Sequence, residues 1–234
     1  MPKKHLVAFV MTLALLATLP AVARASDRDD DTARIRESAR VFHEIMSTPD
    51  KGIPQDLLAK ARCIAIIPGT VKFAFIFGGH YGRGLAVCRT EDGWSAPVFI
   101  AIEGGSVGYQ IGGSATDLVL LFMNQRALQH LLGDKFALGA DAEVAAGPVG
   151  RNASADTDVA MHAEILSYSR SRGIFAGVSL NGTVVHADKS ANEAMYGSNV
   201  TRREIVDGRV PVPAAAQGLT SEISRYAMEA KMNS

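Results

Sequence analysis

Basic residues accompany the glycine-rich stretch from Gly78 to Ser114, and their spacing could bind an anion. In a hairpin that turns between His80 and Tyr81, Lys72 would lie directly opposite Arg89. Like charges that face one another destabilise a sheet, and an anion such as a lipid phosphate between them would relieve this cost. The alternative is that both side chains point into water or pair with neighbouring acidic residues.

One serine in the same stretch has the spacing of a nucleophile. Gly104-Gly-Ser106-Val-Gly108 fits G-x-S-x-G, the nucleophile elbow of α/β-hydrolases, and an apolar strand precedes it. The elbow also needs a following helix, yet residues 109–114 are poor helix formers, and parallel βαβ units are missing. The pattern favours a structural serine, with a serine hydrolase using Ser106 as a distant alternative.

Metal and nucleotide signatures are incomplete. His162-Ala163-Glu164 matches the first half of a zinc deaminase signature, but the required P-C-x-x-C is absent. The chain also has neither G-x-G-x-x-G nor a Walker loop. We therefore expect a protein without catalytic residues, metal or cofactor.

The two cysteines leave two arrangements open. In a simple meander, Cys63 and Cys88 flank the strand of Phe73 on opposite sides, roughly 9–10 Å apart, which is beyond bonding distance. A disulfide requires the first strand to lie beside the third.

The elements that would position these residues alternate between helix and strand periodicity. Apolar residues recur at helical spacing from Thr32 to Met46, and a short helix follows Pro54. Short strands and turns follow, and Asn181-Gly182 indicates a hairpin. The strands are expected near residues 63–67, 71–77, 84–89, 94–102, 118–123, 142–146, 165–169, 174–180 and 183–187. Helices are expected at 124–133 and 215–226.

These elements predict an α+β domain. We expect a curved or closed, mainly antiparallel sheet with glycine-rich hairpin corners, and N-terminal and C-terminal helices packed on it. The N-terminal helix would either cover the core or lie on a membrane surface. Its polar face mixes arginines with glutamates, which is milder than a dedicated anionic-lipid helix, so core cover is favoured.

Composition and the N-terminal segment predict the domain organisation. The 234 residues are 47% hydrophobic and 21% charged, which is typical of a globular chain. Residues 1–25 have a basic start, an apolar run and Ala23-Arg24-Ala25, the pattern of a signal peptide. A charged, mobile leader over residues 26–31 and a single domain over 32–232 would follow. We expect a periplasmic or secreted protein.

Charge argues against nucleic acid as a partner. The signal peptide contains three basic residues and no acidic one, so the exported chain would have 21 basic against 24 acidic residues, about −3. Local basic spots remain compatible with this balance.

Several ordered motifs resemble the SYLF family of lipid-binding modules, over roughly residues 35–220. The resemblance rests on Ala61-Arg-Cys-Ile-Ala-Ile-Ile-Pro68, Phe77-Gly-Gly-His-Tyr-Gly-Arg-Gly84, Gly93-Trp-Ser-Ala-Pro97, Gly104-Gly-Ser-Val-Gly-Tyr-Gln-Ile-Gly-Gly-Ser114, Asp117-Leu-Val-Leu-Leu-Phe-Met-Asn124, Ala145-Ala-Gly-Pro-Val-Gly-Arg151, Ser169-Arg-Ser-Arg-Gly-Ile-Phe-Ala-Gly177 and Tyr196-Gly197.

The resemblance implies phospholipid binding. Eukaryotic members of the family bind phosphoinositides, and the yeast branch also binds actin, a property that an exported protein would not use. The expected partner is an anionic phospholipid or membrane surface, with a structural or protein-partner-binding envelope protein as the alternative. The candidate lipid contacts are Lys72, Arg83, Arg89, Arg151, Arg170 and Arg172.

Overall fold

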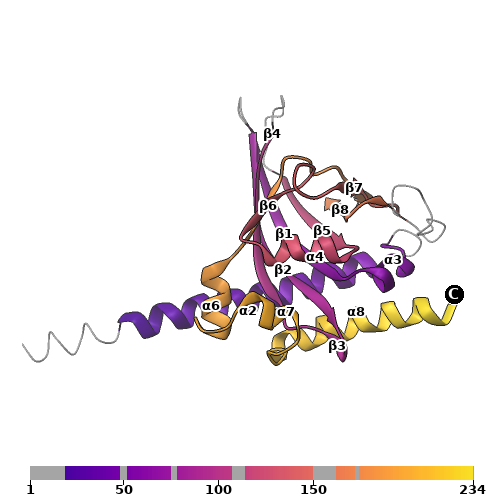
Figure 1. The fold of residues 1–234 in the computed structure, drawn as a ribbon. Coiled ribbons are helices and arrows are strands. Elements are labelled where there is room, and N and C mark those ends of the chain that lie inside the picture. The colour runs from indigo at the N-terminus through magenta and orange to yellow at the C-terminus, as the bar shows by residue number, and fades with distance from the viewer. Residues whose placement is uncertain are drawn as a thin grey trace, which may run out of the picture.

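The computed structural model describes residues 19–47, 52–74, 78–106, 114–149, 162–171 and 174–233, and within them the chain forms one curled sheet flanked by helices (Figure 1). The predicted α+β class is confirmed. The strands are β1 (Cys63–Ala74), β2 (Gly78–Thr90), β3 (Gly93–Trp94), β4 (Val98–Ser106), β5 (Ser114–Phe122), β6 (Lys135–Ala137), β7 (Val144–Ala146), β8 (Ile165–Ser171), β9 (Ile174–Gly177) and β10 (Val184–Ala187). The helices are α2 (Leu19–Met46), α3 (Gln55–Lys60), α4 (Gln125–Leu132), α6 (Lys189–Tyr196), α7 (Arg202–Val206) and α8 (Ala214–Asn233).

The sheet is mainly antiparallel, as the sequence predicts. Its strand order is β6-β10-β4-β2-β1-β5-β8-β7, with β3 paired to β2 and β9 paired to β8. Each described pairing is antiparallel except that of β7 with β8. The central strands β2, β1 and β5 are apolar on both faces at one end because helices cover both sides of the sheet there.

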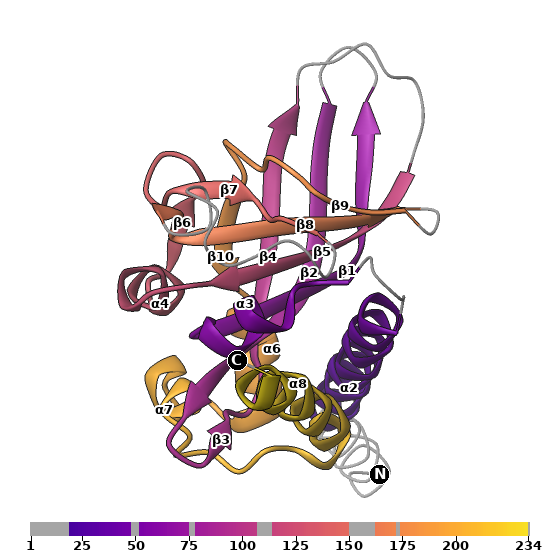
Figure 2. The same ribbon diagram turned by 90° about the vertical axis from the view of Figure 1, so that its right-hand side faces the viewer.

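Two apolar clusters lie on the two faces of the sheet. Ile64 and Ile66 of β1 belong to the cluster beneath α2, α3 and α8, whereas Ala65 and Ile67 belong to the cluster beneath α4 and α7. Figure 2 shows α2 and α8 next to each other, across the lower part of the long strands. The upper ends of the same strands extend beyond these helices.

Helix α2 covers the core, as its amphipathic pattern predicts. Ile35, Phe42 and Ile45 are at most 2% exposed. The helix also includes residues 26–31, where the sequence predicts a mobile leader, and Asp31 is buried. Among the described residues, no helix is long and apolar enough to cross a membrane.

The first strand is longer than predicted. Residues 63–67 and 71–74 form the single strand β1, which passes through Pro68-Gly69 with a bulge instead of turning back. Glycines of β2 make this possible. A Cβ on Gly84 would lie 2.3 Å from the carbonyl oxygen of Ile66, and a Cβ on Gly82 would lie 2.6 Å from Oγ1 of Thr70. These close approaches require residues without side chains.

The hairpin predicted at Asn181-Gly182 is wrong. The two residues do form a turn, with φ of +81° at Gly182 and a bond from the N–H of Thr183 to the carbonyl oxygen of Leu180. However, β9 before the turn pairs with β8, whereas β10 after it pairs with β4 and β6. Helices α6 and α7 were not predicted; the side chains of Asp188 and Thr201 cap their N-termini.

Candidate functional site

Arg83 lies in an ionic cluster that joins α2, β2 and the N-terminus of α6. Its Nη2 is 2.8 Å from Oδ2 of Asp188, and Nη1 of Arg34 donates to the same oxygen at 3.0 Å. Arg34 also pairs with Asp31 at 2.9 Å, and its guanidinium lies 5.3 Å from the centroid of the Phe99 ring. Two carboxylates and two guanidinium groups thus fix the N-terminal half of α2 to the sheet.

Burial opposes the charged form of both carboxylates of this cluster, yet their pKa values shift in opposite directions. For Asp31, the loss of solvation outweighs the nearby arginines, so its pKa is raised. Burial also opposes the charged form of Asp188, but hydrogen bonds from Arg83, the backbone of Ala191 and Ser190 outweigh it, and the pKa of Asp188 is lowered. Asp188 is therefore the ionised centre of the cluster.

Arg170 is also paired internally. From β8 it donates to Oδ2 of Asp117 at 2.7 and 3.0 Å, and it contacts Glu44 of α2. Burial disfavours the Arg170 cation, but the hydrogen bonds to Glu44 and Asp117 outweigh this, and its pKa is raised. The residue therefore fixes the C-terminal half of α2 to the sheet.

The register of β1 with β2 differs from the predicted one, and this changes the position of Arg89 relative to Lys72. Lys72 lies opposite His80, and the turn between the strands falls after Ala74, so Lys72 and Arg89 do not face each other. Arg89 instead donates through Nε and Nη2 to carbonyl oxygens at the end of α3. The side chain of Lys72, and Arg151 and Arg172 altogether, lie outside the described residues.

The described arginines cannot share one headgroup. Asp31 and Glu44, the α2 partners of Arg83 and Arg170, are separated by 13 residues of helix, about 20 Å. Arg83 and Arg89 are six residues apart on β2, again about 20 Å. The sequence could not reveal this, because the acids that pair with Arg83 and Arg170 are distant in the chain.

The long strands instead present an exposed apolar row beyond α2. Tyr81 of β2 lies opposite Val71 of β1, which lies opposite Ala115 of β5. Tyr81 is 45% exposed and Val71 is 50% exposed, and Ala115 is exposed as well. Tyr81 lies on the same face of β2 as Leu85, which α2 covers. The row therefore continues the helix-covered face of the sheet into solvent. We call these three residues the apolar row.

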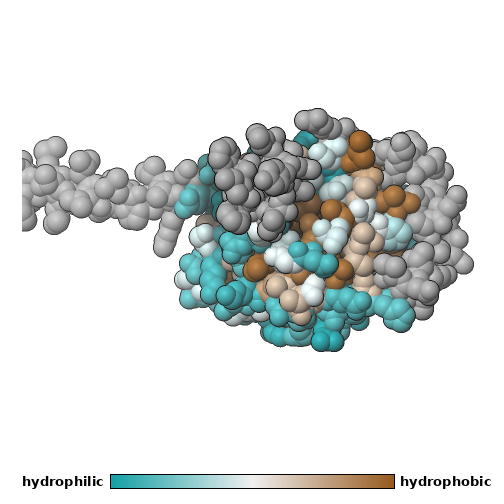
Figure 3. Space-filling model, turned by 90° about the horizontal axis from the view of Figure 1, so that it is seen from above, coloured by the Kyte–Doolittle hydropathy of each residue, from teal (hydrophilic) through white to brown (hydrophobic). Residues whose placement is uncertain are grey.

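Two segments that border this end of the sheet contain no charged residue. Residues 73–79 and 104–116 contain no Asp, Glu, Lys or Arg, although 21% of the whole chain is charged. Lys72 and Glu103 precede these two segments, Asp117 follows the second, and Glu103 lies directly opposite Tyr81. Figure 3 looks down on the molecule from this side and shows apolar side chains mixed with more polar ones in its middle, with a hydrophilic border along the lower side of the view. The two uncharged segments are the feature of the sequence that could have predicted this surface. The spacing of apolar residues, from which the strands were predicted, does not reveal it.

The surroundings of Ser106 differ from a nucleophile elbow. Ser106 is the last residue of β4, which pairs antiparallel with both β2 and β10. An elbow requires a parallel sheet and a following helix. Among the described residues, no group of three or more His, Cys, Asp and Glu side chains is placed to hold a metal ion.

Comparison with known proteins identifies the family. The model of the family described as "Ysc84: Las17-binding protein actin regulator" matches residues 103–226, slightly more than half of the chain. SH3 domain-containing YSC84-like protein 1 of Rattus norvegicus is 35% identical over 205 residues, which cover 86% of this chain and 60% of that protein.

Fungal relatives show a similar match. Protein YSC84 of Saccharomyces cerevisiae is 38% identical over 174 residues, covering 73% of this chain and 37% of that protein. The chain thus spans about 60% or less of the length of these curated relatives. The apolar row of the long strands and the ionic clusters that fix α2 are therefore features of a chain that belongs to the Ysc84 (SYLF) family.

Proposed function

We propose that this protein is a non-enzymatic module that binds phospholipid membranes through the apolar row and the uncharged end of its sheet. One observation carries the proposal: Val71 and Tyr81 lie side by side, about half exposed, next to the uncharged segments 73–79 and 104–116, with Lys72 and Glu103 at the border of this surface. Exposed apolar surface of this kind marks an interaction site, and tyrosine suits the boundary between lipid and water.

The preference for anionic lipid would come from the border of this surface. Lys72 follows Val71 in β1, and Arg83 follows Tyr81 on the same face of β2, with 42% of its side chain exposed. Both positions lie just below the uncharged end, where lipid phosphates would meet a docked protein. Because Arg83 is already paired with Asp188, Lys72 is the residue we expect to contribute most to this preference.

Flotation with lipid vesicles tests the proposal. We expect the protein to float with phosphatidylcholine vesicles that contain phosphatidylglycerol, and less with phosphatidylcholine alone. Val71→Glu and Tyr81→Glu should each weaken this binding about tenfold, because each places a charge where an apolar side chain would leave water. Equal flotation of the wild-type protein with both vesicle types would contradict the anionic preference, and no flotation with either would contradict lipid binding.

Matched variants control for general effects of added charge. Met228→Glu makes the same change at a 59% exposed side chain of α8, away from the apolar row, and should leave flotation unchanged. Lys72→Glu should weaken flotation, whereas Arg62→Glu, at the other end of β1, should not. If the Met228 variant lost binding as well, the effect could not be assigned to the apolar row.

A protein-binding role is the alternative, and the family description supports it, since it names a Las17-binding actin regulator. In that case the apolar row would contact a protein partner. The wild-type chain would then not float with vesicles, and Val71→Glu would abolish recovery of a specific protein in pull-downs from the native source.

We further propose that the protein acts after export, with cleavage near Ala25. The signal-peptide pattern of residues 1–25 supports this proposal. So does the disulfide between Cys63 and Cys88, because disulfides persist in oxidising compartments. Cleavage there would keep the described contacts of α2 with the sheet, among them those of Asp31 and Arg34. N-terminal sequencing of the native protein should begin at Ser26, and a chain that retains residues 1–25 would refute the export proposal.

A further inference from the structure

The end of β1 and β2 opposite the apolar row carries a second unusual arrangement. The N–H of Arg89 donates to the carbonyl oxygen of Arg62 at 2.7 Å, directly beyond the Cys63–Cys88 pair. Arg62 and Arg89 are therefore cross-strand neighbours. Like charges in this position are unfavourable, and the disulfide between Cys63 and Cys88 holds the two strands together next to them.

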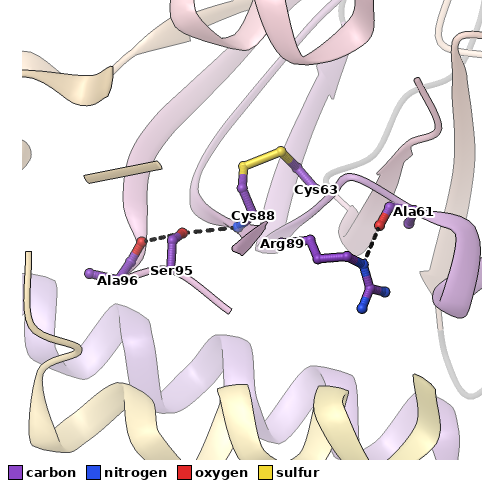
Figure 4. The surroundings of a disulfide bond; sticks show 6 residues. All are labelled: Ala61, Cys63, Cys88, Arg89, Ser95 and Ala96. Atoms are coloured by element: carbon purple, nitrogen blue, oxygen red, sulfur yellow. Dashed lines mark hydrogen bonds between the residues drawn. A yellow bond between two sulfur atoms is a disulfide. The ribbon is translucent and has the colours of Figure 1, made fainter. Parts of the chain in front are cut away.

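Arg89 is held in a fixed orientation. Its guanidinium lies 4.6 Å from the centroid of the Trp94 ring, and Nε donates to the carbonyl oxygen of Ala61 at 3.3 Å (Figure 4). Nη2 donates to Leu58 and Ala59, so the described bonds of this side chain leave Nη1 available. Burial, and then the charge of Arg62, lower the pKa of Arg89. A bound anion would relieve both costs of this cation.

Arg62 is the second half of the site. It is exposed, and among the described residues its side chain makes no ion pair or hydrogen bond. Arg89 is fixed by its hydrogen bonds, and no described partner holds the exposed Arg62 side chain elsewhere, so both guanidinium groups are available to one anionic group. Two guanidinium groups suit a carboxylate or a phosphate oxygen pair.

Both arginines line a cleft of about 790 Å³, within the size range of small-molecule sites. Its wall includes the apolar side chains Leu128, Val210 and Val212. Arg209 also lines the cleft, but Asp207 lies 3.8 Å from it. Glu91 and Asp92 line the cleft as well and would repel ligands with several negative charges.

We propose that this cleft binds a small amphiphilic monoanion, with its carboxylate or phosphodiester group between Arg62 and Arg89 and its apolar part against Leu128, Val210 and Val212. The paired cations select an anion, the three carboxylates disfavour polyanions, and the apolar wall selects a hydrocarbon body. The site lies about 30 Å from the apolar row along β1, so it does not depend on membrane docking.

The only tryptophan of the chain reports directly on this site. Trp94 lies under Arg89, and its emission can be followed while the full chain is titrated with decanoate or lysophosphatidylglycerol below their micelle concentrations. We expect a saturable change with at least one of the two ligands, and about tenfold weaker binding in Arg62→Gln. Arg36→Gln, at an exposed position of α2, is the matched control and should bind as the wild type does.

Three results would overturn the proposal. A response to decanol as strong as the response to decanoate would show that the charge is not recognised, and an equal response to inorganic phosphate would show that the apolar wall is not used. Unchanged affinity in Arg62→Gln, with calorimetry as a second readout, would remove Arg62 from the site. Arg62→Gln should not change vesicle flotation, and Val71→Glu should not change the decanoate titration, so the two proposals fail separately.

Discussion

Single residues of the glycine-rich stretch have separable roles. Gly84 accommodates the carbonyl oxygen of Ile66 at the bulge of β1, whereas a Cβ on Gly105 of β4 would meet nothing within 4 Å. Glycines that look equivalent in the sequence are thus required at one position and dispensable at another. The apolar row and the cleft depend on glycines such as Gly84, which make room for the bulge, because the bulge determines which residues of β1 face which residues of β2.

We therefore predict that Gly84→Ala destabilises the protein by about 1–3 kcal/mol, since the backbone of Ile66 cannot move away without breaking the sheet pairing. Gly105→Ala should change the free energy of unfolding by less than about 0.5 kcal/mol. Urea unfolding of both variants measures this difference. Equal stability of the two variants would show that the close approach at Gly84 is not needed.

The ionic cluster around Asp188 predicts a pH dependence. The pKa of Asp188 is lowered in the folded state, so its contribution to stability is present above its unfolded value of about 4 and is lost as pH falls below that value. Asp31, whose pKa is raised, acts in the opposite sense. Asp188→Asn should cost about 2–4 kcal/mol at pH 7, because Arg34 and Arg83 lose their shared partner.

Urea unfolding from pH 7 down to pH 3 checks this prediction. The wild-type protein should lose more stability over the acid range than Asp188→Asn does. Asp134→Asn removes a carboxylate that is 68% exposed and should follow the wild type. Parallel curves for the wild type and Asp188→Asn would mean that Asp188 does not couple folding to protons.

At the scale of elements, the sequence predicted which segments are helices and strands better than it predicted how the strands are joined and paired. The helical stripe of α2 and the helix expected at 124–133 follow from local spacing; both helices are confirmed, and the side chain of Asn124 caps α4. Pro68-Gly69 is a strong local turn signal, yet β1 continues through it, because Gly82 and Gly84 of β2 make room for the bulge. A compensation supplied by a neighbouring strand is not visible in the local pattern.

The same long strand decides the arrangement of the cysteines. Because residues 63–74 form one strand, Cys63 lies directly opposite Cys88, with Cα atoms 4.0 Å apart, and the two are bonded. The meander arrangement, with a separation of two strand spacings, is therefore wrong. We predict that Cys63→Ser with Cys88→Ser lowers stability by about 3 kcal/mol, as expected for a link across 25 residues.

Chemical unfolding of the oxidised protein and of the double variant measures this loss. A thiol assay in denaturant should find no free thiol in the oxidised protein, because both cysteines are bonded. The denaturant is needed because the two side chains are at most 1% exposed in the folded protein. Two titratable thiols in protein isolated without reductant would contradict the bonded pair.

Helix α2 provides a second test at this scale. Among the α2 side chains that the structure describes, from Asp27 on, the first buried one is Asp31, so a chain that starts at Ser26 should fold with normal stability. Phe42→Ala should cost about 3–5 kcal/mol, whereas Arg36→Ala, at an exposed position, should cost less than about 0.5 kcal/mol. Thermal unfolding measures both. A small effect of Phe42→Ala would indicate that α2 leaves the sheet easily.

At the scale of the whole molecule, the predicted site and the observed surfaces differ for one reason. Charge and the predicted hairpin suggested Arg83, Arg89 and Arg170 as lipid contacts, and each of them is paired with groups that only the tertiary structure brings near. The uncharged segments beside Val71 and Tyr81 were visible in the sequence, yet their meaning depends on β1, β2 and β4 extending beyond α2 (Figure 2).

The molecule therefore has two distinct ends, an apolar row that we propose contacts lipid and a cleft between arginines about 30 Å away along β1. Tyr81→Trp places a fluorescent reporter in the apolar row, while Trp94, which is 7% exposed, serves as the internal reference at the other end. Vesicles that carry bromine atoms in the upper part of their acyl chains quench only tryptophan that enters the bilayer.

This quenching experiment tests the central claim most directly. With brominated vesicles that contain phosphatidylglycerol, the emission of Tyr81→Trp should fall relative to unbrominated vesicles, and the wild-type emission from Trp94 should stay unchanged. Quenching of Trp94 to the same extent, or no quenching of the tryptophan at position 81 in protein that floats with the vesicles, would contradict membrane docking through the apolar row.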